Sequence, residues 1–496
     1  MKKKIKDTYT NIVLKYSYAL INIFSSFYLI NLYLNNFDIK IYGSWIIIIG
    51  IISWFNIIDP GNSNLIIQKI SSNKSNNQHN REVAILNSFV ISSIILILGV
   101  SCSKIFIDKY FDNTIDNEEL ILIFRISIVS LSLMVISFSF LSILEGSFKN
   151  LIGGIILNTY IILKVILIIY LVNKGFGIKS IAISDLIASF CCLISAVITY
   201  FFVQKKINFF KISSFHYFSY TKLLLINFSS KLAKVISKNI DIILIGKLIS
   251  IEFTTIYYLL TILPKYTEGL IGLLFSALRA LIGSINKKYN KKKLKNIYKV
   301  SELNIVWIMG IYVCLLLNFN EFFVNIWTHQ NINDQNNISF YITLIVAIKI
   351  ISNFNQTIVY NFGKIKESNF IDLLYIIILI PTLYISLAFI NLKTFFLFFI
   401  FIECIFHFYR FRRIIHKYLL LDNFNYIYKD LLIILFFNII IYFSYLIFNI
   451  SIKSWIELIF LITITIVVYF VILFLLSSNF RKQLYLIKNI QIKKLI

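Results

Sequence analysis

Apolar runs long enough to cross a lipid bilayer recur along the whole chain, and they constrain its fold more than any other feature. The hydrocarbon core of a bilayer is spanned by a helix of about 20 apolar residues. Only helices and closed barrels satisfy their backbone groups in lipid, and a barrel would need alternating polar and apolar positions. The runs in this sequence are continuously apolar. They therefore predict an all-α, polytopic membrane protein.

The number of predicted membrane spans is about fourteen, which is even and places both termini on one side of the membrane. Composition supports a membrane protein, because 58% of the 496 residues are hydrophobic and only 14% are charged. In soluble proteins about a quarter of the residues are charged. The predicted spans cover residues 11–34, 41–59, 83–107, 121–144, 151–172, 178–203, 222–246, 253–278, 300–319, 338–360, 370–390, 394–411, 430–450 and 455–477.

Basic residues collect in alternate loops of this arrangement and in the C-terminal tail. The loops on the side of the N-terminus and the tail contain Lys69, Lys74, Arg81, Lys149, Lys205, Lys206, Lys211, Lys222, Arg279, the cluster at 287–299, Lys364, Lys366, Arg410, Arg412, Arg413, Lys417, Lys429, Arg481, Lys482, Lys488, Lys493 and Lys494. The opposite loops are nearly free of Lys and Arg, and residues 108–119 are acidic. Cytoplasmic loops are enriched in Lys and Arg. Both termini are therefore predicted to be cytoplasmic, and membrane orientation explains the net charge of +25 without nucleic acid.

Signals of an enzyme or of a metal site are missing from the sequence. All predicted loops are short, so no soluble catalytic domain is expected, and no Walker loop, Gly-x-Gly-x-x-Gly or His-Glu-x-x-His motif occurs. The five cysteines lie in apolar runs without zinc-ligand spacing. The basic start Met1–Lys4 precedes a retained first span, because no cleavage site follows it. We expect a transporter with no cofactor and no metal.

A weak internal repeat relates the first and seventh predicted spans. An ungapped shift of 216 positions (227 − 11) aligns Asn11, Lys15, Tyr18 and Asn22 with Asn227, Lys231, Lys234 and Lys238. The same shift aligns Tyr42 with Tyr258. Matching odd-numbered spans implies two parallel halves of about six helices each. The predicted organisation is a lobe at 1–206, a second lobe at 207–414, and two appended helices with a basic tail at 415–496.

Basic side chains near the middle of spans are the main functional signal. Lys164, Lys231, Lys234, Lys238, Lys265 and Lys349 lie deep in predicted spans, and Lys15 lies nearer an end. A charge at the bilayer centre costs roughly 2.5–3.5 kcal/mol even on the lower, insertion-based scale. These lysines must therefore face protein, an acidic partner or water.

The lysines of the seventh span share one helix face with Asn227 and Asp241. At about 100° per residue these residues fall within a stripe roughly 80° wide. Two such faces, on the first and seventh spans, would line a water-filled cavity between the halves, where lysine suits phosphate. The alternative is that the lysines pair with Asp241, Glu268, Asp59 and Asp185 and only hold the bundle together. We favour the anion-binding cavity because the basic residues outnumber these acids.

One further polar pair lies in a late span, where Glu403 and His407 are four residues apart on one helix face. Such a pair could relay protons. A local ion pair or hydrogen bond is the favoured interpretation.

Short motifs resemble those of Wzx-type polysaccharide flippases. Tyr42-Gly43-Ser44-Trp45, followed by an apolar run into Asp59-Pro60-Gly61, is similar to the N-terminal signature of that family. Asp241 to Gly246 with Tyr257-Tyr258, and Ile326-Trp327, are similar to its later patterns. The sequence departs from the pattern at Pro60 and Thr328. The family belongs to the multidrug/oligosaccharidyl-lipid/polysaccharide exporter superfamily, so the resemblance implies two six-helix lobes around a central cavity, here with two appended helices.

The resemblance also implies a function in the bacterial plasma membrane. The expected cargo is an undecaprenyl-pyrophosphate-linked oligosaccharide repeat unit, as in O-antigen and lipopolysaccharide synthesis, flipped by alternating access. Partners would be membrane lipids, a polysaccharide polymerase and glycosyltransferases. The expected substrate-binding residues are Lys231, Lys234, Lys238, Lys15, Lys164, Lys265 and Lys349, and the candidates for ion coupling are Asp241, Glu268 and Asp59.

Three other functions compete with this expectation. A lipid II flippase has the same fold and similar cargo. A cation-coupled multidrug exporter should have an acidic cavity instead of a basic one. A membrane-embedded polysaccharide polymerase should carry a long extracytoplasmic loop, which this sequence lacks.

Overall fold

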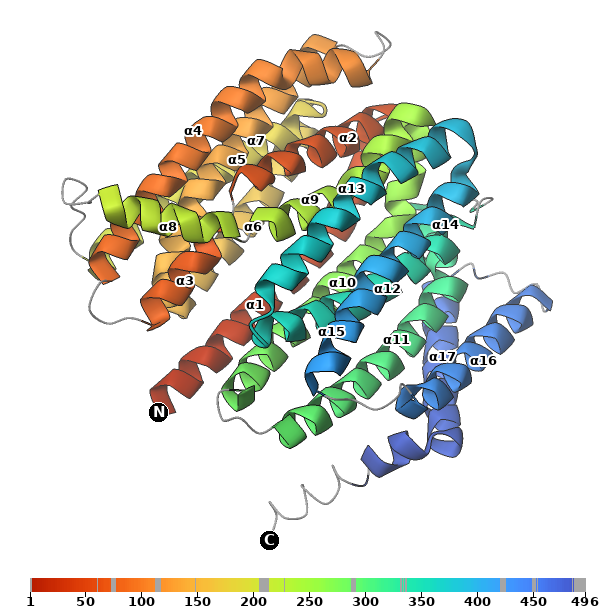
Figure 1. Cartoon of the computed structure of the whole chain (residues 1–496). Coiled ribbons are helices and arrows are strands. Elements are labelled where there is room, and N and C mark those ends of the chain that lie inside the picture. Colours follow the sequence, from red (N-terminus) through yellow and green to blue (C-terminus); the bar gives the residue numbers. More distant parts are fainter. Residues whose placement is uncertain are drawn as a thin grey trace. The chain divides into compact units, whose positions relative to one another are not determined.

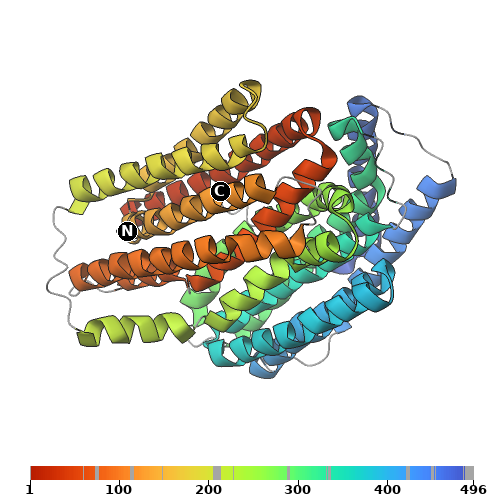
Figure 2. The same ribbon diagram turned by 90° about the horizontal axis from the view of Figure 1, so that it is seen from above.

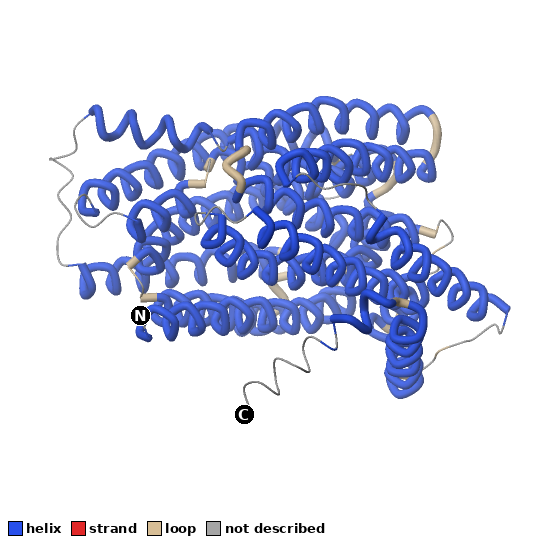
Figure 3. The backbone as a smooth tube through the Cα atoms, turned by 60° about the horizontal axis from the view of Figure 1, so that its bottom comes forward, coloured by secondary structure: helices blue, strands red, loops and turns tan. Residues whose placement is uncertain are grey.

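The computed structural model consists of helices throughout the residues that it describes, and none of these residues forms a strand (Figure 3). The described residues are 2–59, 61–72, 77–111, 117–147, 149–204, 214–226, 228–286, 291–330, 332, 334, 337–419, 425–447, 452, 454–483 and 485. The chain forms two compact units, Met1–Thr255 and Ile256–Ile496.

The first unit is built around α5, which packs between α4 and α7 (Figures 1 and 2). α6 packs on α7, α1 packs on α6, and α2 packs on α9. The helices of this unit are α1 (Lys2–Asn36), α2 (Ile39–Phe55), η1 (Asn56–Ile58), α3 (Asn62–Ser72), α4 (Asn77–Tyr110), α5 (Asn117–Gly146), α6 (Asn150–Asn173), α7 (Lys179–Gln204), α8 (Ser214–Ile226), α9 (Phe228–Leu248) and the first residues of α10 (Ile251–Asn286).

The second unit packs α12 against α14 and adds two further helices to α11. Its remaining helices are α11 (Lys291–Thr328), α12 (Ile338–Asn361), α13 (Ile365–Phe389), α14 (Leu392–Glu403), the π-helix η3 (Cys404–Tyr409), α15 (Arg410–Leu419), α16 (Asn425–Ile447) and α17 (Trp455–Leu476). The Tyr469 hydroxyl of α17 donates to the Trp307 carbonyl oxygen of α11 at 2.6 Å. Asn438 of α16 donates to the carbonyl oxygen of Gly310 on α11. These bonds attach the last two helices to α11.

Each of the fourteen predicted spans overlaps a helix of the structure, which confirms the all-α, polytopic prediction. Eleven helices within the described residues are long and apolar enough to cross a membrane. The predicted spans 222–246, 253–278 and 430–450 overlap α9, α10 and α16, which are not among these eleven. α9 carries Lys231, Lys234, Lys238 and Asp241 within one 21-residue helix, and these charges lower its hydropathy. The lobe boundaries at 206/207 and 414/415 stay predictions.

Exposed apolar side chains cover the outer faces of several helices. On α17, Ile456 is 81% exposed, Phe460 is 62% exposed and Val467 is 60% exposed. A helix that leaves such residues uncovered in a monomer needs an apolar solvent. These faces therefore mark the lipid-facing surface of a multi-pass membrane protein.

Gly43 of the Tyr-Gly-x-Trp motif allows α2 to approach the start of α10 closely. A Cβ atom at this position would lie 2.4 Å from the Ile251 carbonyl oxygen and 2.8 Å from Thr255 Oγ1. Thr255 Oγ1 donates to the Ile39 carbonyl oxygen at 2.9 Å. A shift of the start of α10 away from Gly43 would break this hydrogen bond. Gly43→Ala is therefore expected to lower the free energy of unfolding by about 1–3 kcal/mol, the usual cost of overpacking.

The measurement is the thermal unfolding midpoint of the purified protein in detergent. Gly269→Ala is the matched control, because no atom of the described residues lies within 4 Å of a Cβ built on Gly269. Equal midpoints for the two variants would contradict the close approach of α2 and α10.

Candidate functional site

Lys231 of α9 pairs with Asp59, which lies at the end of η1 in the same unit. Lys231 Nζ lies 3.2 Å from Asp59 Oδ2 and also donates to the Asp59 carbonyl oxygen. Asp59 Oδ1 accepts from the backbone N–H groups of Gly61 and Asn62 at 3.1 and 3.0 Å, at the start of α3. The carboxylate therefore joins α9 to α3. Pro60 lies outside the described residues.

Asn62 continues this junction into the interior of the first unit. Its Nδ2 donates to the Ala84 carbonyl oxygen at 2.8 Å and to Ser139 Oγ at 3.0 Å, and its Oδ1 accepts from the Tyr220 hydroxyl at 2.9 Å. One buried amide thus links α3 to α4, α5 and α8. The Asp-x-Gly motif, which the resemblance connects with flippases, has a structural role at this position.

Lys234 and Lys238 form an exposed basic face of α9. The side of α9 that packs on α2 carries Asn239, whose Nδ2 donates to Ser53 Oγ at 2.7 Å, and Gly246, which lies against Ile47. At about 100° per residue the two lysines lie roughly a quarter to a third of a turn from that side. Both lysines are exposed, and they lie on a side of α9 that is turned away from α2. We call Lys234 and Lys238 the α9 basic face.

Lys164 of α6 pairs with Asp185 of α7. Lys164 Nζ lies 2.6 Å from Asp185 Oδ1, and the same oxygen accepts from the Tyr160 hydroxyl at 2.7 Å. Asp185 Oδ2 accepts from Ser130 Oγ of α5 at 2.8 Å. Tyr160 and Lys164 are four residues apart on α6 and therefore point the same way. The sequence analysis named Asp185 and Asp59 as possible partners of deep lysines, and the structure contains both pairs, Lys164 with Asp185 and Lys231 with Asp59.

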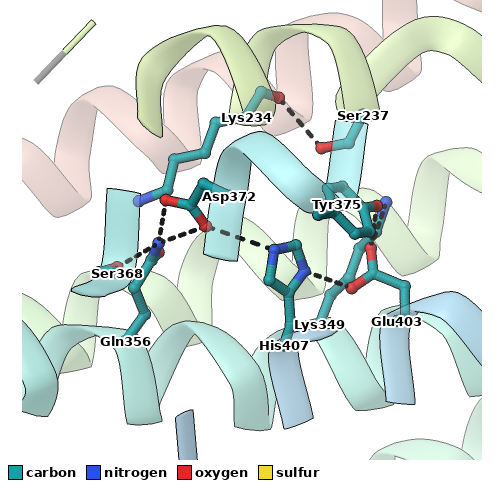
Figure 4. A network of polar contacts seen from close by, with 9 residues as sticks. All are labelled: Lys234, Ser237, Lys349, Gln356, Ser368, Asp372, Tyr375, Glu403 and His407. Atoms are coloured by element: carbon teal, nitrogen blue, oxygen red, sulfur yellow. Dashed lines mark hydrogen bonds and ion pairs between the residues drawn. The ribbon is translucent and has the colours of Figure 1, made fainter. Parts of the chain in front are cut away.

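The second unit contains a buried charge cluster formed by α12, α13, α14 and η3 (Figure 4). His407 Nδ1 lies 2.7 Å from Glu403 Oε2, and His407 Nε2 lies 3.4 Å from Asp372 Oδ1. Lys349 Nζ lies 3.8 Å from Glu403 Oε1, and the Tyr375 hydroxyl donates to that oxygen at 2.6 Å. The two carboxylates are each 1% exposed. The predicted contact of Glu403 with His407 is confirmed.

Gln356 extends the cluster on the Asp372 side. Gln356 Nε2 donates to the two oxygens of Asp372 at 2.9 and 3.2 Å and to Ser368 Oγ at 3.4 Å (Figure 4). Beside the Glu403 end, the Lys349 ammonium lies 4.6 Å from the ring centroid of Phe399, in cation–π range. We call Lys349, Gln356, Asp372, Tyr375, Glu403 and His407 the unit 2 charge cluster.

The other predicted site residues lie apart from these groups. Lys265 Nζ of α10 lies 5.9 Å from the Tyr257 ring centroid. Glu268 accepts from Asn353 Nδ2 of α12 at 3.2 Å. Asp241 is buried, at 5% exposure, in the second half of α9. Lys15 belongs to α1, and its side chain lies outside the described residues.

Three of the predicted substrate-binding lysines form ion pairs within their own unit. Lys164, Lys231 and Lys349 each face a carboxylate within 4 Å. These three lysines are neutralised within their unit and offer a ligand less charge. Lys234 and Lys238 are exposed side chains of α9. A role in substrate binding stays a prediction for all of them.

Asp372, Gln356 and Tyr375 were missed by the sequence analysis. Their signal was present, because Lys349, Asn353 and Gln356 follow at i, i+4 and i+7 on α12, as do Ser368, Asp372 and Tyr375 on α13. This spacing places each set on one helix face. Only packing of the two faces together shows that they form one cluster.

Known structures of transporters share this fold. No family model matches the chain, and no curated protein matches it. An inward-facing multidrug resistance MATE family transporter of the MOP superfamily aligns with a TM-score of 0.64 at 14% identity, covering 82% of this chain and 98% of that one. The lipid II flippase MurJ, in an inward closed conformation, aligns with a TM-score of 0.67 at 16% identity, covering 95% of this chain and 99% of that one.

A third structure is a MOP superfamily transporter from Pyrococcus furiosus, described as having a binding pocket of reverse polarity that suggests a different function. It aligns with a TM-score of 0.58 at 13% identity, covering 83% of this chain and 94% of that one. At these identities the similarity concerns the fold. The chain therefore has the fold shared by MATE transporters and the lipid II flippase.

Proposed function

We propose that this chain is a flippase that moves a lipid-linked oligosaccharide with an anionic pyrophosphate head across a bacterial plasma membrane. The fold supports a transporter, because the proteins that share it are described as transporters and a flippase. The α9 basic face supports an anionic cargo and is the observation that carries the proposal. Undecaprenyl-pyrophosphate-linked repeat units, as in O-antigen and lipopolysaccharide synthesis, are the proposed substrate, and alternating access is the proposed mode of transport.

Exposed lysines on a deep helix are chemically suited to a phosphate-bearing ligand. Lys234 and Lys238 present two ammonium groups about one turn apart, each with three rotatable donors. Exposing these two ammonium groups to lipid would cost several kcal/mol, even on the lower, insertion-based scale. Contact with water and an anionic head group avoids this cost. A cation-coupled drug exporter would instead be expected to present acidic groups at this place.

A lipid II flippase is the second candidate function. The alignment with the lipid II flippase covers 95% of this chain, whereas the alignment with the first MATE transporter covers 82%. The greater coverage favours a protein of the flippase type. Both cargoes carry a pyrophosphate between lipid and sugar, so the α9 basic face suits either one.

Complementation of two mutant strains tests the proposal and separates the two cargoes. One strain lacks the flippase for a surface polysaccharide, and the other is depleted of its lipid II flippase. The proposed function predicts restored surface polysaccharide in the first strain and no rescue of growth in the second. Rescue only of the second would assign lipid II. Failure in both strains, with the protein inserted at normal levels, would contradict a lipid-linked oligosaccharide as cargo.

Cellular context follows from the proposed function. We propose that both termini are cytoplasmic. We also propose that glycosyltransferases act on the lipid-linked unit before the flippase, and that a polysaccharide polymerase acts on it afterwards. The basic loops on the side of the N-terminus support this orientation.

A further inference from the structure

His407 lies between two buried carboxylates, and each of its ring nitrogens faces one of them. The Nδ1 atom lies 2.7 Å from Glu403 Oε2 on the neighbouring turn, and Nε2 lies 3.4 Å from Asp372 Oδ1 on α13 (Figure 4). The ring also stacks on Phe411, at 5.6 Å between centroids, and contacts the tilted ring of Tyr375 at 4.0 Å. The ring orientation is therefore fixed by four neighbours.

With both carboxyl groups ionised, this geometry fits the doubly protonated ring. A neutral imidazole donates from one nitrogen and accepts at the other, whereas the imidazolium donates from both. A carboxylate oxygen accepts and does not donate. In the neutral ring, one nitrogen lone pair would face an oxygen lone pair inside the protein. The two contacts are both satisfied when His407 carries a positive charge.

Charged groups from every element packed on η3 surround this ring. These elements contribute Lys349 from α12, Asp372 from α13 and Glu403 from α14. α15 contributes Arg412, which pairs with Glu302 at 3.1 Å, and Arg410, which stacks on Phe406. A protonated His407 places a positive charge between two carboxylates that are each 1% exposed, and nearby negative charges favour the charged form of a histidine.

We propose that His407 binds one exchangeable proton between Asp372 and Glu403, and that release of this proton is coupled to transport. The second part rests on the proposed function, and the first does not. In the step itself, a ring N–H bond breaks, its electrons stay on the nitrogen, and the proton passes to water. This assignment places ion coupling in the unit 2 charge cluster, which differs from the Asp241, Glu268 and Asp59 candidates of the sequence analysis.

The π-helix η3 gives the proton site a means of responding. His407 lies inside the six-residue π-helix Cys404–Tyr409, between α14 and α15. π-helical turns are rare in proteins and occur frequently at functional sites. When the proton leaves, repulsion between the ring nitrogen and a carboxylate pushes η3 and α13 apart. Proton release would then change the packing of α12, α13 and η3.

The protonation state can be measured without any transport assay. The purified full-length protein, labelled with ¹⁵N-histidine in lipid nanodiscs, reports the state of each ring by nitrogen chemical shift. The wild type is expected to show one imidazolium signal at pH 7.5 that disappears in His407→Gln. Asp372→Asn and Glu403→Gln should each convert this ring to the neutral form. A neutral His407 ring at pH 7.5 would overturn the proton site.

Export measured with the same variants tests the coupling. His407→Gln should abolish export, and His407→Lys should fold and insert normally but also fail to export, since lysine retains its charge and proton. His79→Gln is the matched control, because His79 faces Glu82 at 3.8 Å in the other unit, and it should export normally. Export restored by His407→Lys would show that a fixed charge suffices and would overturn coupling. If the wild type itself exports nothing, the proposed function fails while the ring signals still decide the proton site.

Discussion

Replacing both Lys234 and Lys238 by glutamate is expected to abolish export of the lipid-linked oligosaccharide while the protein still inserts. The α9 basic face is exposed, and under the proposed function it binds the phosphate head group of the cargo. Each lysine near an anionic lipid surface contributes about 1 kcal/mol. Removing two positive charges and adding two negative ones should weaken binding of undecaprenyl pyrophosphate by on the order of a hundredfold or more. The measurements are surface polysaccharide in the complemented strain and binding to the purified protein.

Two controls separate cargo binding from folding in that experiment. Lys234→Arg with Lys238→Arg keeps both charges and is expected to retain most of the export. Lys222→Glu reverses an exposed lysine of α8, outside the α9 basic face, and should leave export unchanged. Export at the wild-type level from the double glutamate variant, at equal protein amounts, would refute an anionic cargo on this face.

Glu302→Ala is expected to produce a large loss of stability in the second unit. Glu302 of α11 faces Arg412 of α15 at 3.1 Å, with side-chain exposures of 2% and 7%. Removing one member of a buried ion pair costs about 3–5 kcal/mol, because the remaining charge has lost both water and its counter-charge. The thermal unfolding midpoint of the purified protein in detergent, with denaturant titration, measures this change.

An exposed ion pair of the same unit provides the matched control. Lys364 and Glu367 lie 2.6 Å apart but are 44% and 48% exposed, and such pairs contribute about 0–1 kcal/mol. Glu367→Ala should therefore change stability little. Replacing Glu302 and Arg412 together by leucine and methionine should recover much of the loss. Equal effects of Glu302→Ala and Glu367→Ala would show that the buried pair does not hold α15 on α11.

Hydropathy predicted the long helices but not the short ones. α3 and α8 have 11 and 13 residues, which is too short to cross hydrocarbon, so they left no span-like signal. α15 has four Arg and Lys residues in ten, and its start was included in the predicted span 394–411. These elements depend on neighbours for their positions: α3 is held by Asn62, and α15 by Arg412.

The candidate site was predicted in its residue types and only partly in its pairs. The spacing of Lys231, Lys234 and Lys238 showed that they share a face, but not that Lys231 reaches back 172 positions to Asp59. The acids Asp59 and Asp185 were named as alternative partners for the lysines. Glu403 was connected only with His407, four residues away, and not with Lys349 on another helix.

The membrane-spanning helices could be predicted from the sequence, because lipid forces every backbone group to find its partner within its own segment. That requirement is local, so runs of about 20 apolar residues and the positions of Lys and Arg are enough to recognise the helices. The neutralisation of charges on these helices could not be predicted in this way. Lys164 is paired with Asp185, whereas Lys238 is exposed. This difference depends on which helix packs beside each lysine, and the charge pattern of one helix does not contain that information.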